Sequence, residues 1–171
     1  MKNFPIFIEG YLDESIINQT VDLIAKQSKY QITRKDFFID RAKGINAVLN
    51  RVIKIDKSCI GIIDDDKVKS NIIDKFQHCG SLGNLNFYYS GNHNTHKFVI
   101  VFVPASEKWI IDSANTIGID NTTTTLKEFT KFSKSHIMIE EIQNIVKKVI
   151  FGEARNAVIF RRIIFGIIKR Y

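Results

Sequence analysis

The sequence predicts an α/β fold with a mainly parallel central sheet of about four strands, covered by helices. Three observations predict it. Short apolar segments alternate with segments whose apolar residues recur at helical spacing, the apolar segments are hydrophobic on both faces, and the links between them are short. Strands buried on both faces are typical of parallel sheets, because crossover helices cover each side. The 171 residues are enough for one hydrophobic core of ordinary size.

The first half of the chain predicts three units of strand followed by helix. The strands are expected at residues 5–8, 37–39 and 59–63, and the first two helices at residues 13–26 and 45–53. Since βαβ crossovers are right-handed, all three strands should end at the same edge of the sheet. A third helix is expected through Val68, Ile72, Ile73 and Phe76.

The second half predicts more strands and then helices. Residues 85–89 are expected to form a strand or one arm of a hairpin, residues 97–103 another strand, and a helix should begin near Pro104. No stretch with the composition of a linker interrupts the rest of the chain. We therefore expect one domain, with its α/β part at residues 1–120 and a helical C-terminal extension at residues 121–171 packed on it. The expected helices of the extension cover residues 126–134, 137–151 and 153–171.

Charge, cysteine content and apolar runs limit the partners and the compartment that the sequence predicts. The formal net charge is +7, so a phosphate-rich partner is compatible with the surface, although charge alone is weak support. The two cysteines, Cys59 and Cys79, lack metal-ligand spacing and indicate a reducing compartment. We see no apolar leader segment and no run of the ~18 apolar residues that a membrane span needs. The sequence therefore predicts a cytoplasmic protein without a membrane role.

Acidic residues follow two of the predicted strands. Glu9 comes directly after the first strand, and Asp64, Asp65 and Asp66 follow the third. Open α/β sheets bind ligands at the carboxyl edge of their strands, so both acidic groups should face one crevice. Carboxylates gathered there repel one another unless a cation neutralises them, and oxygen ligands suit Mg²⁺ or Mn²⁺. The alternative for Asp65 is an ordinary acid at a helix start.

The two acidic motifs resemble those of the Toprim domain. The matching residues are Ile6-Phe7-Ile8-Glu9-Gly10-Tyr11-Leu12-Asp13, then Gly44, then Ile60-Gly61-Ile62-Ile63-Asp64-Asp65-Asp66. This domain is shared by bacterial primases, type IA and type II topoisomerases, ribosomal-RNA maturation ribonucleases and the overcoming-lysogenisation-defect nucleases. The resemblance covers about the first hundred residues. It implies a compact α/β sandwich, with Glu9 as general acid or base or metal ligand, and with Asp64 and Asp66 as Mg²⁺ ligands.

A further acid and several departures qualify the resemblance. The segment around Glu107 and Trp109 is similar to one in small stand-alone Toprim-like proteins, which makes Glu107 either an additional ligand or an ordinary acid at a helix start. Lys67-Val68-Lys69 stands where active relatives carry Pro-Gly or Arg-Glu-Gly after Asp-x-Asp. A primase zinc module and a topoisomerase tyrosine domain are also missing. These departures leave two functions in agreement with the sequence, which are cleavage of nucleic acid and a role as a subunit of a larger complex.

Residues around the acidic motifs and in the basic C-terminal segment are expected to have supporting roles. Asp13 either caps the first helix or braces the turn that carries Glu9. Gly10 and Gly44 are expected to permit close backbone approach or a positive φ, with an ordinary turn as the alternative for Gly44. The amphipathic segment 152–171 either packs with a basic solvent face, docks a partner or presents its arginines to nucleic acid. Basic residues expected to bind a nucleic-acid backbone are Lys67, Lys97, Arg161 and Arg162.

The sequence thus supports two main hypotheses about function. The first is a Mg²⁺-dependent nuclease that hydrolyses phosphodiesters of DNA or RNA. The second is a non-catalytic Toprim-fold binding subunit of a phage-defence or mobile-element complex, with a protein partner such as an ATPase bound through the basic C-terminal helix. A receiver domain, which also holds Mg²⁺ at strand ends, is disfavoured because no late strand ends in lysine.

Overall fold

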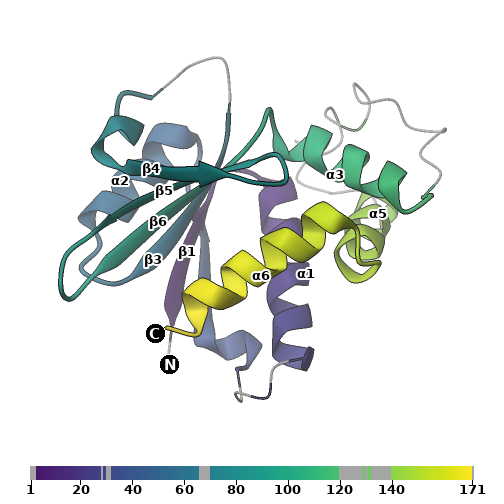
Figure 1. Cartoon of the computed structure of the whole chain (residues 1–171), viewed down its shortest axis with the longest axis horizontal. Helices are drawn as coiled ribbons and strands as arrows, with labels where there is room; N and C mark the ends of the chain where they lie inside the picture. Colours follow the sequence, from purple (N-terminus) through teal and green to yellow (C-terminus); the bar gives the residue numbers. More distant parts are fainter. Residues whose placement is uncertain are drawn as a thin grey trace.

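The computed structural model describes residues 3–27, 29, 32–65, 70–119, 129, 131 and 140–170. Its described part contains one six-stranded sheet and five α-helices (Figure 1). The strands are β1 (Phe4–Ile8), β2 (Phe37–Arg41), β3 (Cys59–Asp64), β4 (Gln77–Ser81), β5 (Leu85–Gly91) and β6 (His96–Phe102). The helices are α1 (Tyr11–Gln27), α2 (Ile45–Lys54), α3 (Ser106–Thr116), α5 (Glu140–Phe151) and α6 (Arg155–Ile168).

The strand order is β2-β1-β3-β6-β5-β4. The first four strands of this order pair in parallel, whereas β5 pairs antiparallel with both β6 and β4. The sheet is therefore mixed, with a parallel centre as expected and with six strands in place of about four. The added pair is a hairpin, since β4 and β5 are joined by a short turn and β4 forms the outer edge.

Each central strand is buried on both faces because helices cover both sides of the sheet (Figure 1). Alternate residues of β1, β3 and β6 join two different hydrophobic clusters. Ile6, Ile62 and Phe102 belong to the larger cluster, which also contains residues of α1, α3, α5 and α6. Phe7 and Val99 belong to the smaller cluster, which α2 covers. This arrangement explains the near-continuous apolar runs in the sequence.

The C-terminal helices belong to the same core as the sheet. Val146 of α5 and Phe160 and Ile164 of α6 are fully buried in the larger cluster, and α5 packs against α1 and α3. The predicted helix at residues 126–134 lies almost wholly outside the described residues. Among the described residues, no helix is both long and apolar enough to cross a bilayer.

One predicted element was wrong. The third strand was expected to lead into a helix through Val68, Ile72, Ile73 and Phe76; Val68 lies outside the described residues, and residues 70–76 contain only a short 3₁₀ helix at Ile73–Lys75 and lead into β4. Ile72 and Ile73 pack at the margin of the α2 cluster, and Phe76 is buried in it. Their helical spacing therefore reflects burial of a turn rather than of a helix.

Strand β4 was not predicted, and it carries an irregularity. The register with β5 shifts between His78 and Gly80, which is a β-bulge. Gly80 has a φ of 135°, in the region that favours glycine. The side chains of β4 are mostly exposed, so its residues QHCGS show no apolar alternation.

Close packing of α2 on β3 gives a first testable expectation. A Cβ atom on Gly61 would lie 2.8 Å from Val52 Cγ2 and 3.3 Å from Val48 Cγ1, both fully buried. We expect Gly61→Ala to reduce the free energy of unfolding by about 1–3 kcal/mol through overpacking, as measured by urea denaturation.

Gly166 on α6 is the matched control. A Cβ there would meet nothing within 4 Å, so Gly166→Ala should stabilise the helix by about 0.5–1 kcal/mol. Equal effects of the two substitutions would contradict the close approach of α2 to β3.

Candidate functional site

Carboxylates from separate chain segments meet at the carboxyl edge of the parallel strands. Glu9 follows β1 and Asp64 ends β3, and these two strands are adjacent and parallel, with Ile8 paired to Ile62. Glu107 lies in the first turn of α3, which follows β6. Asp13 lies in the first turn of α1. The structure therefore brings together four acids from three separate segments of the chain, and their charges act on one another.

Asp13 lies beneath the turn that carries Glu9. The helix begins at Tyr11, so Asp13 is its third residue and not its N-cap, which excludes one of the two interpretations made from the sequence. The Gly10 N–H donates a hydrogen bond to Asp13 Oδ2 over 2.8 Å, an N3-to-N-cap contact that fixes the turn. Gly10 does not need a positive φ. Asp13 is thus the brace of the Glu9 turn.

Burial raises the pKa of Asp13 to about 6. The side chain is only 3% exposed, and the negative charge of Glu107 adds to the effect of burial. Hydrogen bonds from Gly10 and Ser106 oppose the shift without cancelling it. Asp13 Oδ1 is buried and has no hydrogen-bond partner among the described residues. A buried carboxylate oxygen without a hydrogen bond either serves as a ligand for a cation or lowers the stability of the folded state.

Asp64 is held by the beginning of α3. The Ser106 N–H donates to Asp64 Oδ1 over 2.8 Å, and the Ser106 hydroxyl donates to Asp64 Oδ2 over 3.4 Å. Burial nevertheless raises the pKa of Asp64 to about 9, and the negative charges of Asp13, Glu107 and Glu9 contribute to this rise. In the absence of a cation, Asp64 therefore holds a proton at neutral pH.

Two residues at this edge were missed by the sequence reasoning. Ser106 is buried, its N–H donates to Asp64, and its hydroxyl is within reach of both Asp64 and Asp13. Arg41 ends β2 opposite Ile8, its guanidinium lies 3.6 Å from the centre of the Tyr11 ring, and it pairs with Glu14 at 3.3 Å. A basic residue at the end of a predicted strand was a usable signal for Arg41. The serine is ordinary at a helix start, so nothing marked it.

Comparison with protein-family models, curated proteins and solved structures found no match for this chain.

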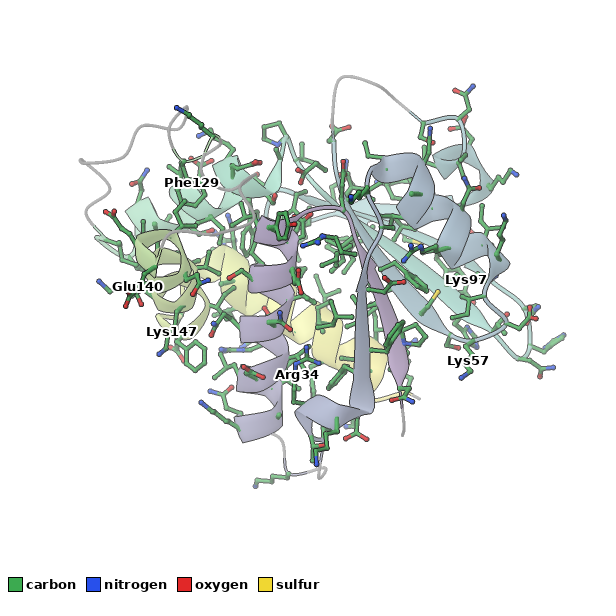
Figure 2. The ribbon with its side chains drawn as sticks, turned by 180° about the vertical axis from the view of Figure 1, so that it is seen from behind. Arg34, Lys57, Lys97, Phe129, Glu140 and Lys147 are labelled. Carbon is green, nitrogen blue, oxygen red and sulfur yellow. The ribbon has the colours of Figure 1, made fainter. Side chains whose placement is uncertain are left out.

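The remaining predicted site residues lie elsewhere or outside the described part. Lys97 is near the start of β6, paired with Cys59, and therefore at the opposite edge of the sheet from Asp64. Figure 2 shows it near Lys57, and its ammonium donates to the Ile53 carbonyl. Gly44 has a φ of 96° and precedes α2, so a positive φ is its role. Asp66 and Lys67 lie outside the described residues.

Arg161 and Arg162 lie on α6 and are remote from the carboxylates. Together with Ile24 and Gln27 at the end of α1, they line a small pocket of about 210 Å³. The carboxylates are at the other end of α1, which at 1.5 Å per residue is roughly 20 Å away. Any contact of these arginines with a ligand is therefore separate from contact at the carboxylates.

The carboxylate cluster fits a hard divalent cation in chemistry and only partly in arrangement. Its donors are carboxylate oxygens, which Mg²⁺ and Mn²⁺ prefer, and Asp13 Oδ1 is a buried oxygen with no hydrogen bond among the described residues. Across that same part of the chain, however, no group of three His, Cys, Asp or Glu side chains is spaced to hold a metal ion. A complete ligand set therefore requires side-chain movement or an additional ligand, for which Asp66 is the candidate.

Proposed function

We propose that this protein is a divalent-metal-dependent phosphodiester hydrolase of the Toprim type, acting on DNA or RNA. The observation that carries the proposal is the convergence of Glu9, Asp13, Asp64 and Glu107 at the carboxyl edge of a parallel sheet, where burial and mutual repulsion raise the pKa of Asp64 to about 9. Repulsion of this kind is a cost that a bound cation removes. The ordered Toprim-like motifs of the sequence support the same conclusion.

Each residue has a role in this proposal. Asp64 and Asp66 hold Mg²⁺ or Mn²⁺, Glu107 is an additional ligand, and Glu9 is either a further ligand or the general base that takes a proton from the attacking water. When bound, the cation stabilises charge on the phosphate and acidifies a water molecule. Ser106 orients Asp64, and Asp13 fixes the turn that presents Glu9. Arg41, at the same edge, is positioned to attract a phosphate.

Basic residues would bind the sugar-phosphate backbone of the nucleic acid. Lys67 follows the Asp-x-Asp motif, and Arg161 and Arg162 would hold nucleic acid at a distance from the reacting phosphate. Lys97 is the weakest member of this group because its ammonium is engaged with the Ile53 carbonyl.

The proposal is tested by cleavage of single- and double-stranded DNA and RNA with Mg²⁺ or Mn²⁺. Glu9→Gln keeps the shape of the side chain and removes its basicity, so we expect it to abolish cleavage in the presence of either metal. Glu140→Gln is the matched control, since this exposed acid begins α5 on the outside of the molecule (Figure 2). Wild-type rates in the Glu9→Gln variant would refute the mechanism.

One observation favours a second candidate function, a non-catalytic binding subunit. The described residues contain no closed metal-ligand group, and α6 has basic but no acidic residues, a surface suited to a partner such as an ATPase. Calorimetric titration with Mg²⁺ separates the two functions. Heat that saturates at millimolar Mg²⁺ supports the hydrolase, whereas absence of binding together with partner capture that depends on Arg161 and Arg162 supports the subunit.

A further inference from the structure

A groove lies on the α6 side of the sheet, away from the carboxylates. Its volume is about 850 Å³, within the ~300–1,000 Å³ typical of small-molecule sites. Strands β4, β5 and β6 form its floor, and the C-terminal part of α6, at the lower left of that helix in Figure 1, forms a wall. It reaches His96 at the start of β6, whereas Asp64 pairs with Phe102 at the end of that strand. The two sites are therefore separate.

Aromatic side chains form the floor of the groove. Tyr89 and Phe98 are only partly buried, and their ring centroids are 5.3 Å apart. Ile163 and Ile167 of α6 contribute the facing apolar wall. A planar ring fits between an aromatic sheet face and such a helix ridge, where stacking and apolar contact act on its two sides.

The polar groups that line the groove indicate that it binds an anionic ligand. Of the residues that the structure describes, Arg170 lines the groove and no acidic residue does, and none of the ion pairs found among them involves Arg170. A guanidinium binds phosphate through two parallel hydrogen bonds. The Tyr89 hydroxyl lies 2.8 Å from His96 Nδ1, which supplies a further hydrogen-bonding pair on the floor.

We propose that this groove binds a nucleoside monophosphate, with the base against Tyr89 and Phe98 and the phosphate on Arg170. A planar ring matches the aromatic floor better than an acyl chain does, because the rings of Tyr89 and Phe98 offer it a stacking surface. A single cation at one end matches a single phosphate group, whereas a nucleic-acid strand would need a row of cations. The proposal does not depend on hydrolase activity.

Isothermal titration of the full chain with AMP, GMP, CMP and UMP tests the proposal. We expect saturable binding of at least one of them below about 1 mM. Arg170→Ala should weaken that binding about tenfold while leaving the weaker binding of the parent nucleoside unchanged. Tyr89→Leu should weaken nucleotide and nucleoside alike, also by about tenfold. Asp64→Asn, at the other site, should leave nucleotide binding intact.

Arg162→Ala is the matched control because this arginine is on α6, the helix that leads into Arg170, but does not line the groove. Equal losses in Arg162→Ala and Arg170→Ala would show attraction to overall charge and overturn the proposal. It would also be overturned by absence of binding for all four nucleotides, or by tighter binding of dodecanoate. Ile163→Trp, compared with Ile163→Leu, fills the groove and should abolish binding, with circular dichroism used to verify that both variants fold.

Discussion

The wild-type protein is expected to lose ~2–4 kcal/mol of unfolding free energy between about pH 5 and pH 9, and the Asp64→Asn variant to lose much less. Burial, and then the charges of Asp13 and Glu107, raise the pKa of Asp64 from 3.8 to about 9. Between these pH values the folded state holds a proton that the unfolded state has released. The stability that this proton contributes is complete below about pH 4 and is lost as the pH rises through about 9.

Urea denaturation in EDTA at several pH values measures this effect. The stability of Asp64→Asn relative to wild type should increase with pH, and Mg²⁺ should restore wild-type stability at pH 9 by binding the ionised cluster. Asp112→Asn is the matched control, because Asp112 is on α3 and pairs with Lys108 rather than with the cluster. Parallel pH profiles for Asp64→Asn and wild type would show that the carboxylates do not interact as described.

Trp109→Ala is expected to reduce the free energy of unfolding by about 3–5 kcal/mol. Trp109 is fully buried, with its ring centroid 5.1 Å from that of Phe102 and 5.7 Å from that of Phe160. Its Nε1–H donates to the Gly83 carbonyl over 3.1 Å. These contacts join α3 to β6, α6 and the turn before β5, so they also fix the helix start that carries Ser106 and Glu107.

Trp109→Phe separates packing from hydrogen bonding. It keeps an aromatic ring but leaves the Gly83 carbonyl without its donor, and should cost about 1–2 kcal/mol. Because Trp109 is the single tryptophan of the chain, unfolding of the variants has to be followed by far-ultraviolet circular dichroism. An alanine variant as stable as the phenylalanine variant would contradict the anchoring role of Trp109.

The sequence was most informative where burial leaves a pattern. The parallel strands β1, β3 and β6 contain long buried runs, so their apolar residues predicted their positions and, for β1 and β3, their parallel direction. Strand β4 is an exposed edge, where backbone hydrogen bonds rather than side chains define the strand, and Gln77–Ser81 therefore carried no signal. After the third strand an apolar pattern is present but the predicted helix is not found among the described residues, because apolar spacing alone does not distinguish a helix from a buried turn.

The candidate site was predictable in part for similar reasons. Strand ends placed Glu9 and Asp64, because the carboxyl edge of a parallel sheet is a property of topology. The partnership of Ser106 with Asp64 joins residues 42 positions apart, and only the register of β3 with β6 brings them together. Asp13 was assigned to a helix cap or a brace, and the choice depended on where α1 begins.

The bulge in β4 bears on how the protein behaves at high concentration. An edge strand offers a row of backbone donors and acceptors with which a second chain can pair, and such pairing leads to aggregation. Gln77–Ser81 contains neither lysine nor proline, the residues that commonly prevent this. The register shift between His78 and Gly80 interrupts the row instead. Glycine at position 80 therefore protects solubility as well as shaping the local backbone.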